Sequence, residues 1–151
     1  MATGDQATGV TIRAATAADT SALSALIAQL GYSASEREVA ERLASMQQEK
    51  RLVLVAEMGG NVVGCLSTST MRVLHRPAPV GRISMMVVDE ALRGHGIGAA
   101  LVRAAERALS AVGCQLVEVT SHLTRSDAHR FYERLGYERT SVRLARETGD
   151  G

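Results

Sequence analysis

The clearest candidate for a functional site is a glycine-rich turn in the second half of the chain. Arg93-Gly94-His95-Gly96-Ile97-Gly98 follows an apolar run that ends at Val88 and precedes a helix-like run. Glycines at alternating positions reach backbone conformations closed to other residues and keep side chains away from a ligand. Successive backbone N–H groups can then converge on one anion, helped by the positive end of the following helix. The turn is a candidate phosphate or pyrophosphate site, with Arg93 as a charged donor at its rim.

Two other interpretations of this turn stay open at this point. Gly94, Gly96 and Ala99 also fit the G-x-G-x-x-A fingerprint of dinucleotide-binding folds, which needs an acidic residue at the end of the next strand. Glu118 lies near the required distance but in the middle of its expected strand. The third interpretation is a flexible connection without a ligand, since glycine-rich loops are common.

A second segment, about thirty residues further on, concentrates the aromatic residues. They make up only 3% of the chain, yet Phe131, Tyr132 and Tyr137 lie close together. Ser126 is a natural N-cap and Gly136 a natural C′ residue, so the sequence predicts a short helix between them. A tyrosine on such a helix face is by default a core residue that packs its ring and satisfies its hydroxyl. The pattern alone leaves open whether Tyr132 serves packing or chemistry.

Together, the two segments resemble the GNAT superfamily of N-acetyltransferases. The acyl-CoA signature of that family is Arg/Gln-x-x-Gly-x-Gly/Ala, which residues 93–98 match. The family also carries an Ala-x-x-Phe-Tyr-x-x-x-Gly-Phe/Tyr helix, which residues 128–137 match. The resemblance extends over about residues 10–145, including the order of the elements. It implies an N-acetyltransferase that moves an acetyl group from acetyl-CoA to a primary amine by direct attack in a ternary complex.

The resemblance also implies roles for individual residues. The pantetheine arm of acetyl-CoA would lie where the strand that ends at Val88 diverges from the strand at residues 116–120, against the backbone of Met86, Val87 and Val88. Tyr132 would act as the general acid, since a phenol can return a proton to the departing thiolate. The other expected cofactor-binding residues are Arg93, Gly94, His95, Gly96, Ile97, Gly98, Arg125 and Phe131.

The general base is where the sequence departs from the family pattern. Many relatives carry a glutamate on the strand before the glycine turn, whereas Ile83-Ser84-Met85-Met86 holds no ionisable group. His122 is the candidate base because histidine titrates near neutrality, and Glu118 and His75 are weaker candidates. A solvated loop position for His122 and a water chain as the base both stay open. Arg125 stands where relatives often have asparagine, and would contact a phosphate or an acidic substrate group.

Two other functions stay open beside the transferase. A non-catalytic acyl-CoA-binding or regulatory module would keep the fold; the missing glutamate favours this alternative and Tyr132 argues against it. A nicotinamide-dependent oxidoreductase would use the glycine turn alone. The amine acceptor stays open between a small molecule and a peptide or protein, and so does the acyl-chain preference.

These residues need a scaffold, and the hydrophobic pattern predicts one. Apolar runs predict strands over residues 10–13, 51–57, 62–70, 81–88, 116–120 and 137–145. Helical periodicity predicts two helices after the caps Thr16 and Ser35, and two more over residues 99–112 and 127–135. Gly59-Gly60 predicts a tight hairpin turn. We therefore expect one α/β (α+β) domain with a GNAT-type, mixed, largely antiparallel sheet flanked by helices.

Length and composition limit the function classes. The chain has 151 residues, 46% hydrophobic and 22% charged, which is typical of one globular domain. A net charge of +1, with Lys50 as the only lysine, favours neither nucleic acid nor a membrane surface as a partner. The apolar runs are too short to cross a bilayer. Cys65 and Cys114 are expected to be buried free thiols in a reducing cytoplasm.

The expected boundaries are a disordered tail over residues 1–9, a domain over residues 10–146 and a frayed tail over residues 147–151. The four histidines show no metal-ligand spacing, so no metal is expected. The oligomeric state stays open, with a homodimer among the alternatives.

Overall fold

The computed structural model describes residues 9–121 and 126–149. They divide between Val119 and Thr120 into two compact units, and each unit is described by itself. The expectations for residues 1–8, for His122 and for Arg125 lie outside the described residues.

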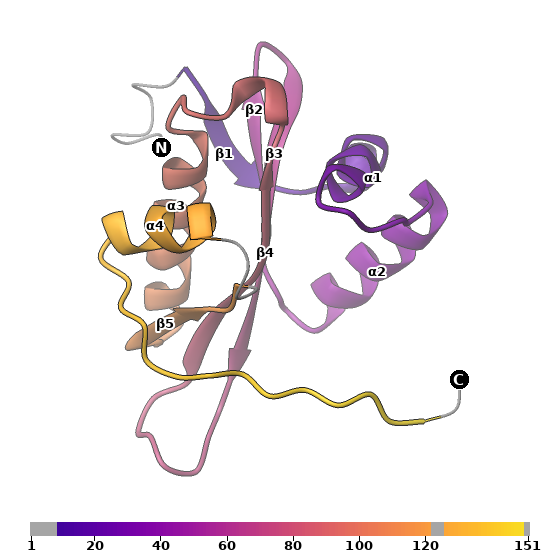
Figure 1. Cartoon of the computed structure of the whole chain (residues 1–151). Helices are drawn as coiled ribbons and strands as arrows, with labels where there is room; N and C mark the ends of the chain where they lie inside the picture. Colours follow the sequence, from indigo (N-terminus) through magenta and orange to yellow (C-terminus); the bar gives the residue numbers. More distant parts are fainter. Residues whose placement is uncertain (1–8, 122–125, 150–151) are drawn as a thin grey trace. The chain divides into compact units, whose positions relative to one another are not determined.

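The first unit is built on a five-stranded sheet with the strand order β1-β2-β3-β4-β5 (Figure 1). Its strands are β1 (Thr11–Ala14), β2 (Val53–Met58), β3 (Asn61–Met71), β4 (Val80–Val88) and β5 (Leu116–Val119). Neighbouring strands pair antiparallel, except for β4 and β5, which are parallel. The prediction of a mixed, largely antiparallel sheet is therefore confirmed.

Helices cover both faces of this sheet. Helices α1 (Thr20–Gln29) and α2 (Glu36–Gln48) lie on one face, and α3 (Ile97–Ala111) lies on the other and connects β4 to β5 (Figure 1). Two 3₁₀ turns, η2 (Ala17–Asp19) and η3 (Glu90–Leu92), precede α1 and α3. Helix α3 begins two residues before its predicted start, because Gly96 ends the turn as the N-cap.

Local chemistry explains several of these boundaries. At the start of α2, the N–H of Ser35 donates to the Glu38 carboxylate at 2.9 Å, and the N–H of Glu38 donates to Ser35 Oγ at 3.1 Å. This pair is the predicted capping box. Gly59 and Gly60 form the predicted two-residue hairpin, with φ of 57° and 82°. Between α2 and β2, Lys50 has φ of 60°, the only non-glycine among the described residues in the left-handed region.

The core has one layer on each side of the sheet. On the side of α1 and α2 it comprises Ala15, Leu23, Leu26, Val39, Leu43, Val53, Val55, Cys65 and Val87. On the other side α3 packs closely, since a Cβ at Gly81 would lie 2.9 Å from Leu109 Cδ1. Both cysteines are buried and free, as expected. Burial raises the pKa of Cys65 to about 12, so its thiol stays protonated near neutral pH.

An ion cluster ties β1 to the start of α1. Arg13 donates to Asp19 at 2.9 Å and to Glu57 of β2 at 2.8 Å. Asp19 is only 6% exposed and also accepts the N–H of Thr16 at 2.8 Å. The hydrogen bond from Arg13 holds the pKa of Asp19 below its ordinary value, and the same bond raises the pKa of Arg13. The cluster therefore fixes the entry of the chain into α1.

The second unit contains α4 (Ser126–Arg134) followed by an irregular segment. Gly136, with φ of 100°, ends the helix as predicted. The prediction of a strand over residues 137–145 is wrong, because these residues form neither helix nor strand. Val142 and Leu144 alternate as they would in a strand, yet they are 73% and 90% exposed. An alternating pattern describes only side chains, whereas a strand also needs a partner for its backbone.

Candidate functional site

The glycine turn leaves β4 directly and presents backbone N–H groups at the start of α3. Gly94 and Gly96 both adopt positive φ, 83° and 80°, which L side chains rarely adopt. The N–H of Ala100 bonds to the carbonyl of Gly96 at 3.1 Å. The preceding N–H groups of Ile97 and Gly98 have no carbonyl partner within the helix. The side chain of Ile97 is 1% exposed and anchors this end of α3 in the core.

The two larger polar residues of the turn differ in what they contact. His95 Nδ1 lies 2.9 Å from the carbonyl oxygen of Leu92 and 3.1 Å from that of Arg93. The imidazole therefore folds back on the turn and stabilises it. The Arg93 side chain is exposed and makes no hydrogen bond within the described residues. It is thus available to a ligand at the rim of the turn.

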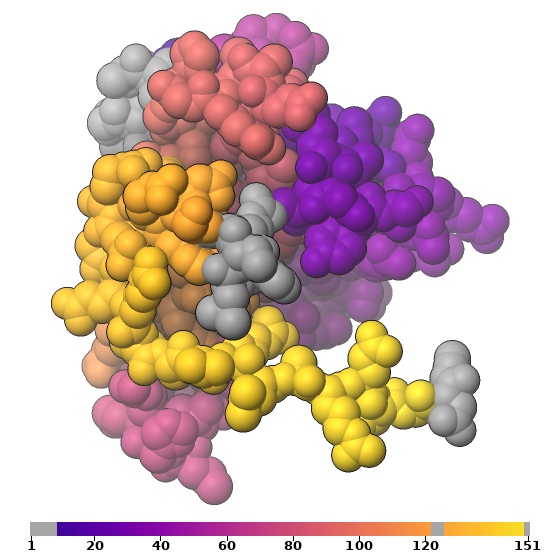
Figure 2. All heavy atoms as spheres, viewed as in Figure 1, coloured from indigo at the N-terminus to yellow at the C-terminus, as the bar shows by residue number. Residues whose placement is uncertain are grey.

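A glutamine at the end of α1 holds the segment that leads into the turn. The N–H of Glu90 donates to Gln29 Oε1 at 2.9 Å, and Gln29 Nε2 lies 3.5 Å from Asp89 Oδ1. Figure 2 shows this segment lying against α1. Sequence reasoning missed Gln29, because its partners are about sixty positions away and no local pattern indicates the contact.

The strands β4 and β5 pair over only half the length of β4. Their parallel pairing runs from Val80 opposite Leu116 to Ile83 opposite Val119 and then ends. Within the described residues, the stretch 84–88 pairs with β3 alone. Among the described residues of the first unit, no strand pairs with the other backbone edge of this stretch, which we call the open edge and which leads into the glycine turn. It contains the expected pantetheine-binding residues Met86, Val87 and Val88.

A β-bulge marks the point where the two strands part. On β3, Ser67 lies opposite Met85 and Thr68 lies opposite Ile83, so Ser84 is the extra residue of β4. A bulge re-aims side chains and increases the local twist. The exposed Ser84 hydroxyl lies 2.8 Å from Ser67 Oγ and donates to the Ser67 carbonyl at 3.2 Å. Ser84 therefore projects from the sheet beside the open edge.

Four polar side chains, Ser67, Ser84, Arg82 and Glu118, lie on one face of the sheet beside this bulge, and we call them the polar strip. Arg82 lies opposite Ser69 on β3 and Glu118 on β5, and alternate residues of a strand share a face. Arg82 Nε donates to Glu118 Oε1 at 2.9 Å. Sequence reasoning did not single out Arg82, although its alternation with Ser84 in an apolar strand was a signal.

The two weaker candidates for the general base, Glu118 and His75, lie in the first unit. Glu118 forms an ion pair with Arg82. His75 lies in the loop before β4, at the opposite end of that strand from the glycine turn. A nine-residue strand spans roughly 25 Å, so the structure does not bring His75 to the turn. His122, the first candidate, lies outside the described residues.

In the second unit, Tyr132 lies at the centre of an aromatic cluster. Its ring is edge-on to Phe131, with centroids 5.0 Å apart, and to Tyr137, with centroids 5.7 Å apart. Tyr132 is 9% exposed. The carbonyl of Tyr132 accepts the N–H of Leu135 and that of Tyr137, both at 3.0 Å, which closes the helix end around the ring. Phe131 and Tyr137 therefore both pack against the Tyr132 ring.

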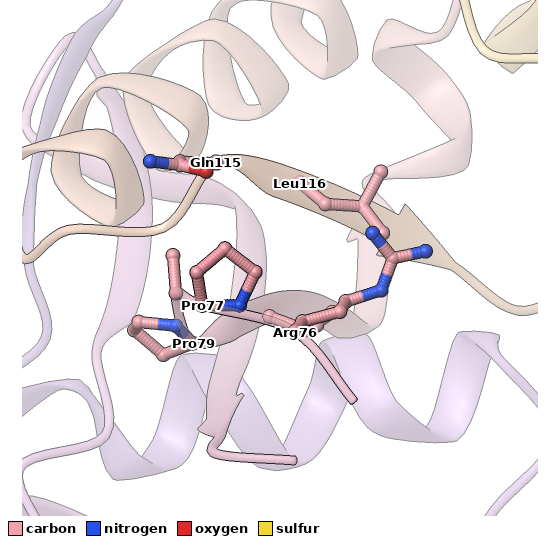
Figure 3. Close-up of a pocket in the computed structure, with 7 residues that line it drawn as sticks. Arg76, Pro77, Pro79, Gln115 and Leu116 are labelled. Atoms are coloured by element: carbon pink, nitrogen blue, oxygen red, sulfur yellow. The ribbon is translucent and has the colours of Figure 1, made fainter. Parts of the chain in front are cut away.

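A shallow pocket lies away from these residues. Figure 3 shows Arg76, Pro77 and Pro79 of the loop before β4 across from Gln115 and Leu116. Its volume of about 190 Å³ is below the roughly 300–1,000 Å³ of ordinary ligand sites. Val80 and Leu116 begin β4 and β5, so the pocket lies at the strand ends opposite the glycine turn.

Within residues 9–121 and 126–149, no group of three or more His, Cys, Asp or Glu side chains could hold a metal ion. Over the same residues, none of the helices has the length and apolar character needed to span a bilayer.

Comparison with known proteins gives consistent matches. Residues 20–137 match the model of the acetyltransferase (GNAT) family. An aminoalkylphosphonate N-acetyltransferase of Salmonella typhimurium is 34% identical over 140 residues, which cover 89% of each chain. A transcriptional regulator from Bacillus halodurans C-125 superposes with a TM-score of 0.81 at 27% identity, covering 92% of this chain and 99% of that one. An aminoglycoside N-acetyltransferase in complex with CoA shares the fold, with a TM-score of 0.83 at 17% identity and coverage of 92% and 94%.

Proposed function

The chain belongs to the acetyltransferase (GNAT) family, and we propose that it transfers the acetyl group of acetyl-CoA to the primary amine of a small molecule. One observation carries this proposal. An open backbone edge on β4 continues into a turn of positive-φ glycines and then into the N-terminus of α3. This arrangement offers neighbouring sites for an extended amide chain and for a pyrophosphate.

The cofactor would bind along that continuous backbone. The amides of the pantetheine arm would pair with the open edge of β4 at Met86 and Val88, as an added strand would. The pyrophosphate would accept hydrogen bonds from the N–H groups at Gly96 to Gly98, where the helix end is positive. Arg93 would add a charge-assisted contact at the rim. The CoA complex of the aminoglycoside N-acetyltransferase, which has the same fold, supports this choice of co-substrate.

The reaction would proceed by direct attack, without an acyl-enzyme. The neutral amine forms the new C–N bond, the C–S bond of the thioester breaks, and coenzyme A leaves as a thiolate. An amine with a pKa of about 10.4 must first lose a proton, which would go to water or to His122. The nitrogen loses a second proton to water as the amide forms, and this proton balances the one that the thiolate gains. Tyr132 would protonate the thiolate, and backbone N–H groups beside Val88 would stabilise the tetrahedral oxyanion.

The acceptor is proposed to be a small amine. The Salmonella relative is named for aminoalkylphosphonates, which are small molecules with one amine and one acidic group. At 34% identity over most of both chains, it supports an acceptor of similar size here.

The test measures CoA thiol release from acetyl-CoA in the presence of a panel of primary amines. We expect release that depends on both substrates, together with thermal stabilisation by CoA and not by NAD, because a bound ligand raises the melting temperature. Stabilisation by CoA without transfer to any amine would contradict catalysis and favour a binding module. Stabilisation by NAD alone would favour the oxidoreductase.

A further inference from the structure

We propose that the polar strip of Ser67, Arg82, Ser84 and Glu118 is the acceptor subsite, and that Arg82 binds an acidic group on the acceptor. The substrate class is then a short primary amine that also carries an oxyanion, either a phosphonate or a carboxylate. This inference rests on the proposed transfer from acetyl-CoA and specifies which amines the site selects.

The location of the strip is the first argument. Ser67 is two residues beyond Cys65 on β3 and so shares its face, the one that packs against α1 and α2. The apolar core on this face includes Cys65 and Val87, and the strip lies next to it along β3 and β4. Ser84 is exposed at the bulge where β5 stops pairing. A molecule held on the strip is therefore adjacent to the open edge of β4 where the thioester is proposed to lie.

The charge arrangement is the second argument. Both contacts of Arg82 with Glu118 go to the same carboxylate oxygen, Oε1, and use Nε and Nη2. Within the described residues, the remaining terminal nitrogen, Nη1, makes no hydrogen bond. The two side chains are 31% and 37% exposed, so a solute can reach them. Glu118 thus holds the guanidinium in a fixed orientation while Nη1 remains a charged donor for an oxyanion.

The spacing is the third argument. Residues two apart on a strand are about 7 Å apart, so Arg82 and Ser84 can contact opposite ends of one small molecule. With its acidic group on Arg82, a two- or three-carbon acceptor extends its amine toward Ser84. The Ser84 hydroxyl can accept a hydrogen bond from that amine, and the bond to buried Ser67 orients the hydroxyl. The amine then points along β4 toward the thioester.

The experiment compares three acceptors of similar length: 2-aminoethylphosphonate, β-alanine and propylamine. We expect the unmodified protein to use an acidic acceptor with a kcat/KM about 10- to 100-fold above that for propylamine, the range for one charge-assisted contact. Arg82→Gln should remove this advantage through a higher KM for the acidic acceptor. Its KM for acetyl-CoA should stay unchanged, because Arg82 is proposed to contact the acceptor and not the cofactor. Arg82→Lys should retain part of the preference.

Arg103→Gln is the matched control. Arg103 also pairs with a glutamate, Glu106 at 2.8 Å, but it lies on α3 on the other side of the sheet. This variant should keep the preference for acidic acceptors. Equal use of propylamine and both acidic acceptors by the unmodified protein would overturn the inference and leave the acetyl transfer intact. An unchanged preference in a folded Arg82→Gln variant would overturn it too. Absence of transfer to any amine would instead contradict the proposed function itself.

Discussion

At the scale of single residues, the proposed chemistry depends most on the hydroxyl of Tyr132. The ring is fixed between Phe131 and Tyr137, so replacing tyrosine by phenylalanine should preserve the packing of the cluster. A packing role and a general-acid role of Tyr132 therefore predict different results for this substitution.

We expect Tyr132→Phe to lower kcat by about 10- to 1,000-fold and to leave the Kd for acetyl-CoA nearly unchanged. General acids typically contribute about 10²–10⁴-fold when proton transfer limits the rate. The effect is smaller, at the lower end of the expected range, where amine attack limits the rate instead. Single-turnover kinetics and binding measured on the same preparation provide the check.

Tyr137→Phe is the control, because it removes a hydroxyl from the same aromatic cluster. This variant should keep its kcat. If Tyr132→Phe instead turns over normally and loses only stability, about 1 kcal/mol for one hydrogen bond, Tyr132 is a packing residue. The binding-module alternative would then gain support.

At the scale of elements, the proposed cofactor site combines β4, the glycine turn and α3. Gly96 combines two requirements in one residue. It needs φ of 80° to end the turn, and it starts the helix whose N–H groups face the proposed pyrophosphate. A side chain at this position affects both the backbone and the ligand.

We expect Gly96→Val to raise the Kd for acetyl-CoA at least about tenfold, the effect of losing one charge-assisted hydrogen bond. The control is Gly113→Val at the far end of α3, where φ is 101° and no atom would contact the added Cβ. Both variants place a valine at positive φ, 80° at Gly96 and 101° at Gly113, so each carries backbone strain. Isothermal titration should show weakened binding only for Gly96→Val, and equal affinities would remove the pyrophosphate assignment.

Elements whose cause is local could be predicted from the sequence. Gly59-Gly60 and Ser35 carry their own turn and cap chemistry, and both predictions are confirmed. The prediction of a strand at residues 137–145 is wrong, because the alternation of apolar side chains does not specify a neighbouring strand for the backbone to pair with.

The candidate site also divides into a local part that the sequence predicts and a part set by pairing between strands that it does not. The glycine turn is a local motif, and the positive φ of Gly94 and Gly96 agrees with its sequence. The bulge at Ser84 arises from the register with β3, and the pair of Arg82 and Glu118 arises from the register with β5. The sequence of β4 alone specifies neither register, so the polar strip could be identified only from the structure.

At the scale of the whole molecule, we expect the protonation of Asp19 to contribute to the pH dependence of the free energy of unfolding. Its pKa in the folded state is lowered, chiefly by the hydrogen bond from Arg13. A carboxyl group of this kind stabilises the fold above its unfolded pKa of about 3.9, and this contribution is lost as the pH falls through the folded pKa.

We therefore expect Asp19→Asn to lower the free energy of unfolding by about 1.5–3 kcal/mol at pH 7, the range for a hydrogen bond to a charged group. The difference from the unmodified protein should shrink as the pH falls below about 4. Urea unfolding at a series of pH values measures it. Glu41→Gln, which removes the exposed pair with Arg37 at 3.4 Å, should change stability by less than about 1 kcal/mol. A pH-independent effect of Asp19→Asn would contradict the assignment.

The left-handed backbone at Lys50 has a practical consequence for any assay of amine acetylation. An acetyltransferase preparation can acetylate its own lysines, and that signal obscures transfer to an added acceptor. Here Lys50 is the only lysine in the chain. Its φ of 60° is one that glycine adopts without steric cost. Lys50→Gly therefore removes every lysine amine from the protein at a position where glycine relaxes the backbone, leaving acetylated lysine absent from the enzyme's own mass spectrum.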